Sequence, residues 1–172
     1  MNAVAKLGAM IAAAVVLGAV GCASSDDTLT ASDPALVAAL TSAGDAWQAA
    51  GVPAPGVASG TEANVQAVDD ATFNERCQTT KTSTLACTFA PTDGGKVHMW
   101  IRASLLDNPT ELQAIVTHEV GHVIQAHLTG STPTHLSAAQ GCVDGAPHSP
   151  HAMCAWAGAE ITSADVALVE GE

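Results

Sequence analysis

Residues 111–128 constrain the fold more than any other segment, because their apolar positions recur at helical spacing. The segment follows Asn108 and Pro109, and a capping residue followed by proline is a typical helix start. Its periodic apolar positions are 112, 115, 116, 120, 123 and 124. This spacing predicts a long helix with one apolar face that the rest of the chain must cover.

The same segment contains the pattern H-E-x-x-H, formed by His118, Glu119 and His122. Residues four apart share one face of a helix, so both imidazoles can point at one metal ion, and neutral imidazole is a good zinc ligand. A glutamate next to the first histidine can accept a proton from a water that attacks a carbonyl. The motif predicts Zn²⁺ as the cofactor and Glu119 as the general base, although the same residues on a structural helix would form a plain polar face.

Residues 96–169 resemble the metzincin clan of zinc peptidases, and its small matrixin-like members in particular. The resemblance covers a strand at 96–102, the motif helix, the tripeptide Ala-Met-Cys around Met153, and residues 161–166 before a final helix. It implies an α+β fold in which a small mixed sheet packs against the active-site helix, with a C-terminal helix. It also implies that Met153 forms a methionine turn beneath the metal, where the alternative is ordinary core packing.

The third metal ligand departs from the metzincin pattern H-E-x-x-H-x-x-G-x-x-H. The glycine position holds Gln125, the third histidine position holds Leu128, and His127 comes one residue early. On a continuous helix His127 would point about 180° away from His118. His127 is therefore a ligand only if the helix breaks before it.

Other side chains compete for the third position. His148 and His151 come just before Met153 and are alternatives to His127. His135 is a candidate that the sequence favours less, and Glu160 would supply a carboxylate as in other H-E-x-x-H clans. We expect His98, in the middle of a strand, to be structural.

The N-terminus predicts export. Lys6 precedes an apolar run at 7–20, which is shorter than the ~20 residues of a membrane-spanning helix and is typical of a signal peptide. Residues 19–22 read Ala-Val-Gly-Cys and resemble a bacterial lipobox, which implies cleavage before Cys22 and lipid on its sulfur. We therefore expect a signal peptide at 1–21, a tether at 22–32 and the catalytic domain at 33–172. An ordinary signal peptide that happens to contain a cysteine is the alternative.

Four cysteines follow Cys22, and an even number in an exported chain suggests two disulfides. Three pairings are possible. The short sequence separations favour Cys77 with Cys87 and Cys142 with Cys154.

Turn and capping residues outline the remaining elements. A helix is predicted after Asp33 and Pro34, ending at Gly51. Strands at 84–90 and 96–102 are predicted to form a hairpin, and residues 63–75 a short strand and a loop. A last helix is expected to begin near residue 163, capped by either Thr162 or Ser163.

The balance of charged residues limits the kinds of partner that the protein can bind. Lys and Arg total 5 against 17 Asp and Glu, a formal net charge of −12, which argues against nucleic acid as a partner. The sequence predicts a zinc-dependent metalloendopeptidase that acts on a peptide or protein substrate. We expect it to be held by its lipid on the outer membrane or surface of a bacterial cell. The alternative is a non-catalytic lipoprotein with a binding or structural role, on a degenerate metzincin-like scaffold that has lost its third ligand.

Overall fold

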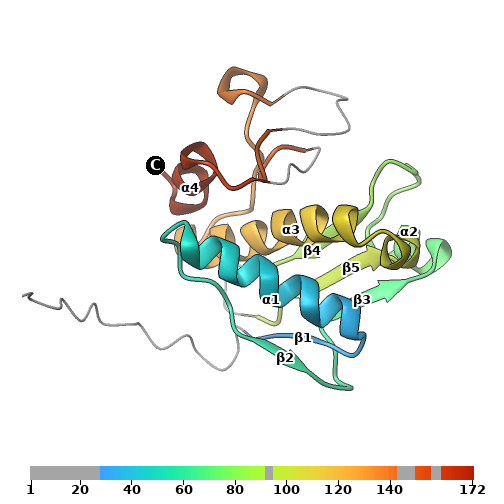
Figure 1. Cartoon of the computed structure of the whole chain (residues 1–172). Helices are drawn as coiled ribbons and strands as arrows, with labels where there is room; N and C mark the ends of the chain where they lie inside the picture. Colours follow the sequence, from blue (N-terminus) through green and yellow to red (C-terminus); the bar gives the residue numbers. More distant parts are fainter. Residues whose placement is uncertain (1–27, 92–94, 143–149, 156–159) are drawn as a thin grey trace, which may run out of the picture.

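The helix that carries the motif is α3 (Pro109–Thr129), and it lies in the middle of the fold, with other elements on more than one side of it (Figure 1). The computed structural model describes residues 28–91, 95–142, 150–155 and 160–172. The expected α+β class is confirmed. In chain order the elements are β1 (Leu29–Ala31), α1 (Pro34–Ala49), β2 (Val57–Ser59), β3 (Val65–Val68), α2 (Asp70–Arg76), β4 (Ala86–Phe89), β5 (His98–Arg102), η2 (Ala103–Asp107), α3, η3 (Ala138–Gln140) and α4 (Ser163–Glu170).

Helix α3 begins and ends at the residues that its sequence indicates. The side chain of Asn108 accepts a hydrogen bond from the backbone N–H of Glu111, and Pro109 occupies the first turn. Gly130 ends the helix in the left-handed conformation, with φ of 61°, and its N–H bonds the carbonyl of Ala126. Because α3 continues to residue 129, the break that His127 would need as a ligand does not occur.

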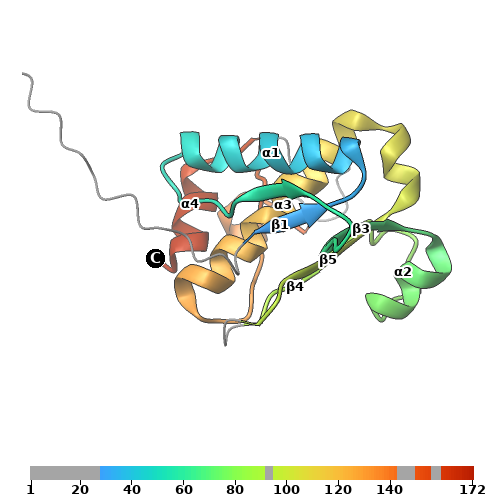
Figure 2. The same cartoon turned by 90° about the horizontal axis from the view of Figure 1, so that it is seen from below.

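The three-stranded sheet has the order β3-β5-β4, with β3 parallel and β4 antiparallel to β5. The predicted hairpin of β4 and β5 is therefore confirmed, and the sheet is mixed. Met99 and Ile101 alternate along β5 as fully buried side chains. Strand β4 lies at the edge of the sheet and is the strand beside α3, as Figure 2 shows from below.

The N-terminal part of the domain is more extensive than expected. Leu29 and Ala31 are buried in β1, which pairs in parallel with β2. The predicted tether at 22–32 is thus wrong at its end, since the apolar residues of β1 belong to the core. The loop expected within 63–75 is also wrong there, because Asp69 caps the helix α2.

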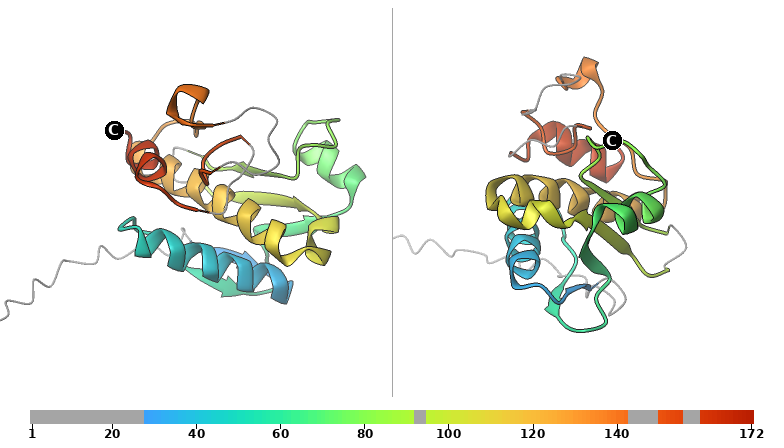
Figure 3. Two further views of the ribbon diagram at one scale, coloured as in Figure 1. Left: turned by 45° about the horizontal axis from the view of Figure 1, so that its top comes forward. Right: turned by 90° about the vertical axis from the view of Figure 1, so that its right-hand side faces the viewer.

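Helix α3 lies between α1 and the segment that follows α3, as the two views of Figure 3 show. Trp47 of α1 is fully buried and donates its indole N–H to the carbonyl of Thr117. On the other side, α4 packs against α3. The capping of α4 by Thr162 agrees with the prediction. The motif helix is thereby held on two sides.

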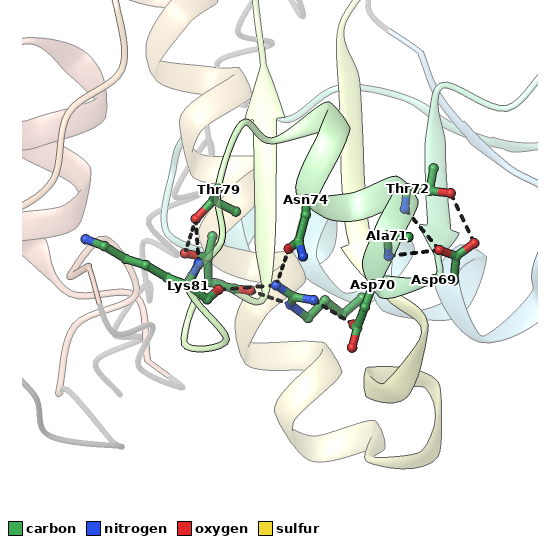
Figure 4. Close-up of polar contacts among 9 residues, drawn as sticks. Asp69, Asp70, Ala71, Thr72, Asn74, Thr79 and Lys81 are labelled. Atoms are coloured by element: carbon green, nitrogen blue, oxygen red, sulfur yellow. Dashed lines mark hydrogen bonds and ion pairs between the residues drawn. The ribbon is translucent and has the colours of Figure 1, made fainter.

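A buried arginine organises the loop between α2 and β4. Arg102 donates to the side chains of Asp70 and Asn74 and to the carbonyls of Lys81 and Thr84. Figure 4 shows Asp70 and Asn74 on α2 and Lys81 on the following loop within this one polar cluster. The cluster fixes the loop that leads into the edge strand.

Both predicted disulfides form, Cys77–Cys87 and Cys142–Cys154. The first joins the end of α2 to β4, and the second joins two parts of the segment after α3. Disulfides persist in oxidising compartments, so they indicate a location outside the cytoplasm. Among the described helices, none is long and apolar enough to cross a membrane.

Candidate metal centre

Three histidines bring their Nε2 atoms together beside the middle of α3. His118 and His122 come from the helix, as the motif predicts, and His135 comes from the loop that follows it. The Nε2 of His135 lies 3.1 Å from that of His122 and 3.2 Å from that of His118. Two of the rings are buried and that of His135 is on the exposed side. The structure thus groups the two motif histidines with His135, a candidate that the sequence favoured less than His127, His148 or His151.

The donor set fits a metal ion. The Nδ1 of His118 lies 2.7 Å from the carbonyl oxygen of Ala152, which can only accept, so Nδ1 carries the proton and Nε2 of the neutral ring offers a lone pair. Two nitrogen ligands at about 2.0–2.1 Å from a tetrahedral ion lie roughly 3.3 Å apart. The observed spacings are close to this value. A cation between the rings would also relieve the repulsion of converging lone pairs.

Burial keeps these imidazoles in the neutral form that a metal requires. Removal from water lowers the pKa of His118, and the same cause, reinforced by the neighbouring rings, puts the pKa of His122 far below its usual range. Withdrawal from water, with a smaller effect of His118, lowers the pKa of His135 to about 4. Protons therefore compete weakly for this site at neutral pH. Among the described residues, the Nδ1 of His122 is the buried side-chain atom without a hydrogen-bond partner.

Glu119 lies beside the histidines and is 5% exposed. Its Oε2 accepts a hydrogen bond of 2.5 Å from the hydroxyl of Thr88 on β4. Burial raises the pKa of Glu119 to about 7, and the bond from Thr88 opposes this rise. A carboxyl group with a pKa near neutrality can both accept and release a proton.

The four side chains open into a cleft of about 1110 Å³. One wall is the edge strand β4 with the loop before it, and another is the N-terminal half of α3. Most of the lining is small or apolar, including Ala86, Thr110, Ala114 and Ile115. The cleft is therefore a groove beside a strand edge with the histidines and Glu119 at its floor.

Met153 lies directly against the motif helix. It is fully buried, and a Cβ on Gly121 would overlap its sulfur and would lie 2.7 Å from Cζ2 of Trp47. Because Gly121 has no side chain, Met153 can approach α3 closely at this position, which lies between His118 and His122 in the sequence. The buried carboxylate of Asp165 accepts from the backbone N–H of Met153 and fixes this turn to the cap of α4.

The other predicted ligands lie elsewhere. His127 is exposed on α3, and the described histidines that group are His118, His122 and His135 instead. His151 bonds Thr162 through its Nδ1 and packs over Gly141, so it is part of the local structure of this loop. The other alternative ligand, His148, lies outside the described residues, and so does Cys22.

Two further candidates have structural surroundings. Glu160 is exposed, and its backbone carbonyl accepts from the N–H of Ala152. His98 stacks on Trp100 with their ring centroids 5.6 Å apart, which agrees with the structural role expected for it. Neither belongs to the group of potential metal ligands found among the described residues.

A comparison of the chain with protein-family models, with curated proteins and with solved structures found no match.

Proposed function

We propose that this protein is a zinc-dependent metalloendopeptidase. The observation that supports the proposal most is the convergence of three histidine Nε2 atoms beside a buried glutamate, at the floor of one cleft. The likeness of the motif and of the Met153 turn to metzincin peptidases supports the same assignment. His118, His122 and His135 would hold the metal.

The donor set favours zinc over harder cations. Three neutral imidazoles suit zinc, whereas magnesium and calcium prefer oxygen ligands. Three protein ligands also leave a position open, which is the arrangement of catalytic zinc sites rather than of structural ones. When bound, zinc supplies Lewis acidity that polarises a carbonyl and acidifies water.

Glu119 would then act as the general base. Its carboxylate would accept a proton from the attacking water, and the resulting carboxylic acid would pass that proton to the leaving amine. Thr88 holds one carboxylate oxygen, which leaves the other for the reacting water. The chain's own residues thus provide the proton transfer that hydrolysis of an amide requires.

The cleft suits an extended peptide as the substrate. Strand β4 lies at the edge of the sheet and lines the cleft, and an exposed strand edge binds peptide backbone by adding a further strand. The small side chains along the groove leave room for the side chains of such a peptide. A peptide or protein substrate is accordingly the partner that we propose.

Replacement of Glu119 by glutamine tests the activity. We expect Glu119→Gln to lower kcat on an unstructured protein such as casein by about 10²-fold, because the amide cannot accept the proton. Zinc content should stay unchanged, since Glu119 is not a ligand. The matched control is Glu111→Gln, which removes another cleft carboxylate of α3 and should leave kcat within about threefold. Equal activity of wild type and Glu119→Gln, or zinc-loaded wild type without activity, would overturn the proposal.

A degenerate scaffold without catalysis has less support. That alternative rested on the displacement of the third ligand at Leu128 and His127. His135 groups with His118 and His122 as a possible third ligand, which weakens the reason for that alternative.

We also propose attachment to a bacterial membrane through lipid at Cys22. Strand β1 begins at Leu29, so only residues 23–28 would separate the lipid from the folded domain. The expected result is that the mature protein extracted from membranes has the mass of a chain starting at Cys22 with lipid attached. An unmodified Cys22 in that intact-mass measurement, or an equal membrane fraction for Cys22→Ser, would contradict it.

A further inference from the structure

A buried glutamine lies on the same face of α3 as the metal-binding histidines. Gln125 follows His118 by seven residues and His122 by three, so helical geometry places all three side chains on one side. Gln125 is 5% exposed. Burial of an amide is unfavourable unless its donor and acceptor are both satisfied, so its hydrogen bonds are informative.

Both polar atoms of the Gln125 side chain are paired. Oε1 accepts from the backbone N–H of Thr134 at 2.8 Å, and Nε2 donates to the carbonyl of Leu168 at 3.2 Å and to the Thr134 hydroxyl at 3.1 Å. The orientation of the amide is unambiguous, because a backbone N–H can only donate and a carbonyl can only accept. Gln125 therefore joins α3, α4 and the loop after α3.

The loop carries His135 immediately after the residue that Gln125 holds. On the other side of His135, the backbone N–H of Leu136 bonds the carbonyl of Met153 at 2.9 Å. Both neighbours of the histidine are thus fixed, one by Gln125 and one by the methionine turn. His135 itself makes its contacts with the other two rings.

We propose that Gln125 is the positioning residue for the third metal ligand. The hydrogen bond between Gln125 and Thr134 holds the loop after α3 against the C-terminal half of that helix. This contact places the next residue of the loop, His135, opposite His118 and His122. A continuous helix that lacks a histidine on its ligand face after residue 122 needs such a connection to complete the site. The proposal rests on the metal site described above and not on its peptidase activity.

The test is the affinity for Zn²⁺ alone, measured by competition with a chromophoric chelator on the full chain with both disulfides intact. Gln125→Met keeps the size of the side chain and its helix propensity but loses all three hydrogen bonds. We expect zinc affinity to fall roughly 10–100-fold, the effect typical of residues that orient metal ligands. Gln113→Met is the matched control, since Gln113 bonds Ala39 and Thr117 away from the ligand loop, and it should change affinity less than about threefold.

A double mutant that also lacks His135 separates an effect on ligand positioning from a general effect on folding. In His135→Ala, the third ligand is already absent, so adding Gln125→Met should lower zinc affinity no further. An equal loss in both backgrounds, or no loss from Gln125→Met alone, overturns the proposal. If Gln125→Met does not fold, Gln125→Glu decides, because its buried carboxyl group retains the acceptor for Thr134 and, when protonated, a donor for the Leu168 carbonyl: a folded Gln125→Glu should bind zinc within about threefold of wild type. Loss of zinc from that folded variant would refute the role of the Thr134 bond.

Discussion

Replacement of His135 by alanine is expected to lower zinc affinity by roughly 10²–10³-fold. Structural zinc sites bind with about 10–16 kcal/mol through four ligands, so one ligand contributes about 2.5–4 kcal/mol, and each 1.4 kcal/mol is about tenfold in affinity. The Nε2 of His135 lies within 3.2 Å of the Nε2 atoms of both His118 and His122. No other described histidine can therefore take its place unless the loop after α3 moves. The measurement is chelator competition with purified, oxidised protein.

His127→Ala is the control that distinguishes this site from the one predicted by motif spacing. His127 is exposed on the same helix, and the change should leave zinc affinity within about threefold of wild type. If His127→Ala loses zinc and His135→Ala keeps it, the ligand set proposed here is wrong.

Gly121→Ala is expected to destabilise the metal-free protein by about 3 kcal/mol. The new Cβ would overlap the sulfur of Met153 and lie 2.7 Å from the indole of Trp47. Methionine is flexible, but the backbone of Met153 is fixed by Asp165. The indole ring of Trp47 is rigid and donates its N–H to the carbonyl of Thr117, so moving the ring away from the new Cβ would break this hydrogen bond. Chemical denaturation without metal measures the effect.

Gly44→Ala is a matched control within a second helix. The nearest atoms to a Cβ there are 3.9 Å and 4.0 Å away, so alanine fits without strain. Because alanine favours helices over glycine, this change should stabilise the protein by about 0.5–1 kcal/mol. The close-packing account of Gly121 fails if both changes stabilise the protein, or if they destabilise it equally.

Local signals predicted α1, α3, α4, the hairpin of β4 and β5, and three of the four side chains that meet in the site. The cap at Asn108, the helical apolar spacing and the H-E-x-x-H pattern describe α3, and His118, Glu119 and His122 lie together because of helix geometry alone. The disulfides followed from short separations in sequence. These features depend on neighbours within a few residues, which is why they can be recognised without the fold.

The position of His135 beside His118 and His122 depends on tertiary contacts, and for that reason the sequence favoured other candidates over it. Its position is set by Gln125, which bonds Thr134 nine residues later, and by the pairing of Leu136 with Met153. One signal was present in the sequence. Gly130 ends the helix after His127, so a histidine beyond this turn is better placed to return to the motif than one before it.

The misassigned N-terminal strand has a related cause. The segment 29–31 has only three residues, most of them small. It is recognised as a strand only because it pairs with β2, and β2 is separated from it in the sequence by the whole of α1. Burial of Leu29 comes from this pairing and from contact with the core. Thr88 illustrates the same limit in the site, because its bond to Glu119 joins two elements that are distant in sequence.

The zinc K-edge X-ray absorption spectrum of the oxidised protein, loaded with one equivalent of zinc, tests the central claim most directly. The ligand set proposed here predicts three imidazole nitrogens at about 2.0–2.1 Å and one further oxygen donor, with no sulfur. A shell of oxygen atoms alone, a sulfur ligand, or a protein that retains no zinc after removal of the free metal would contradict the proposed centre at His118, His122 and His135.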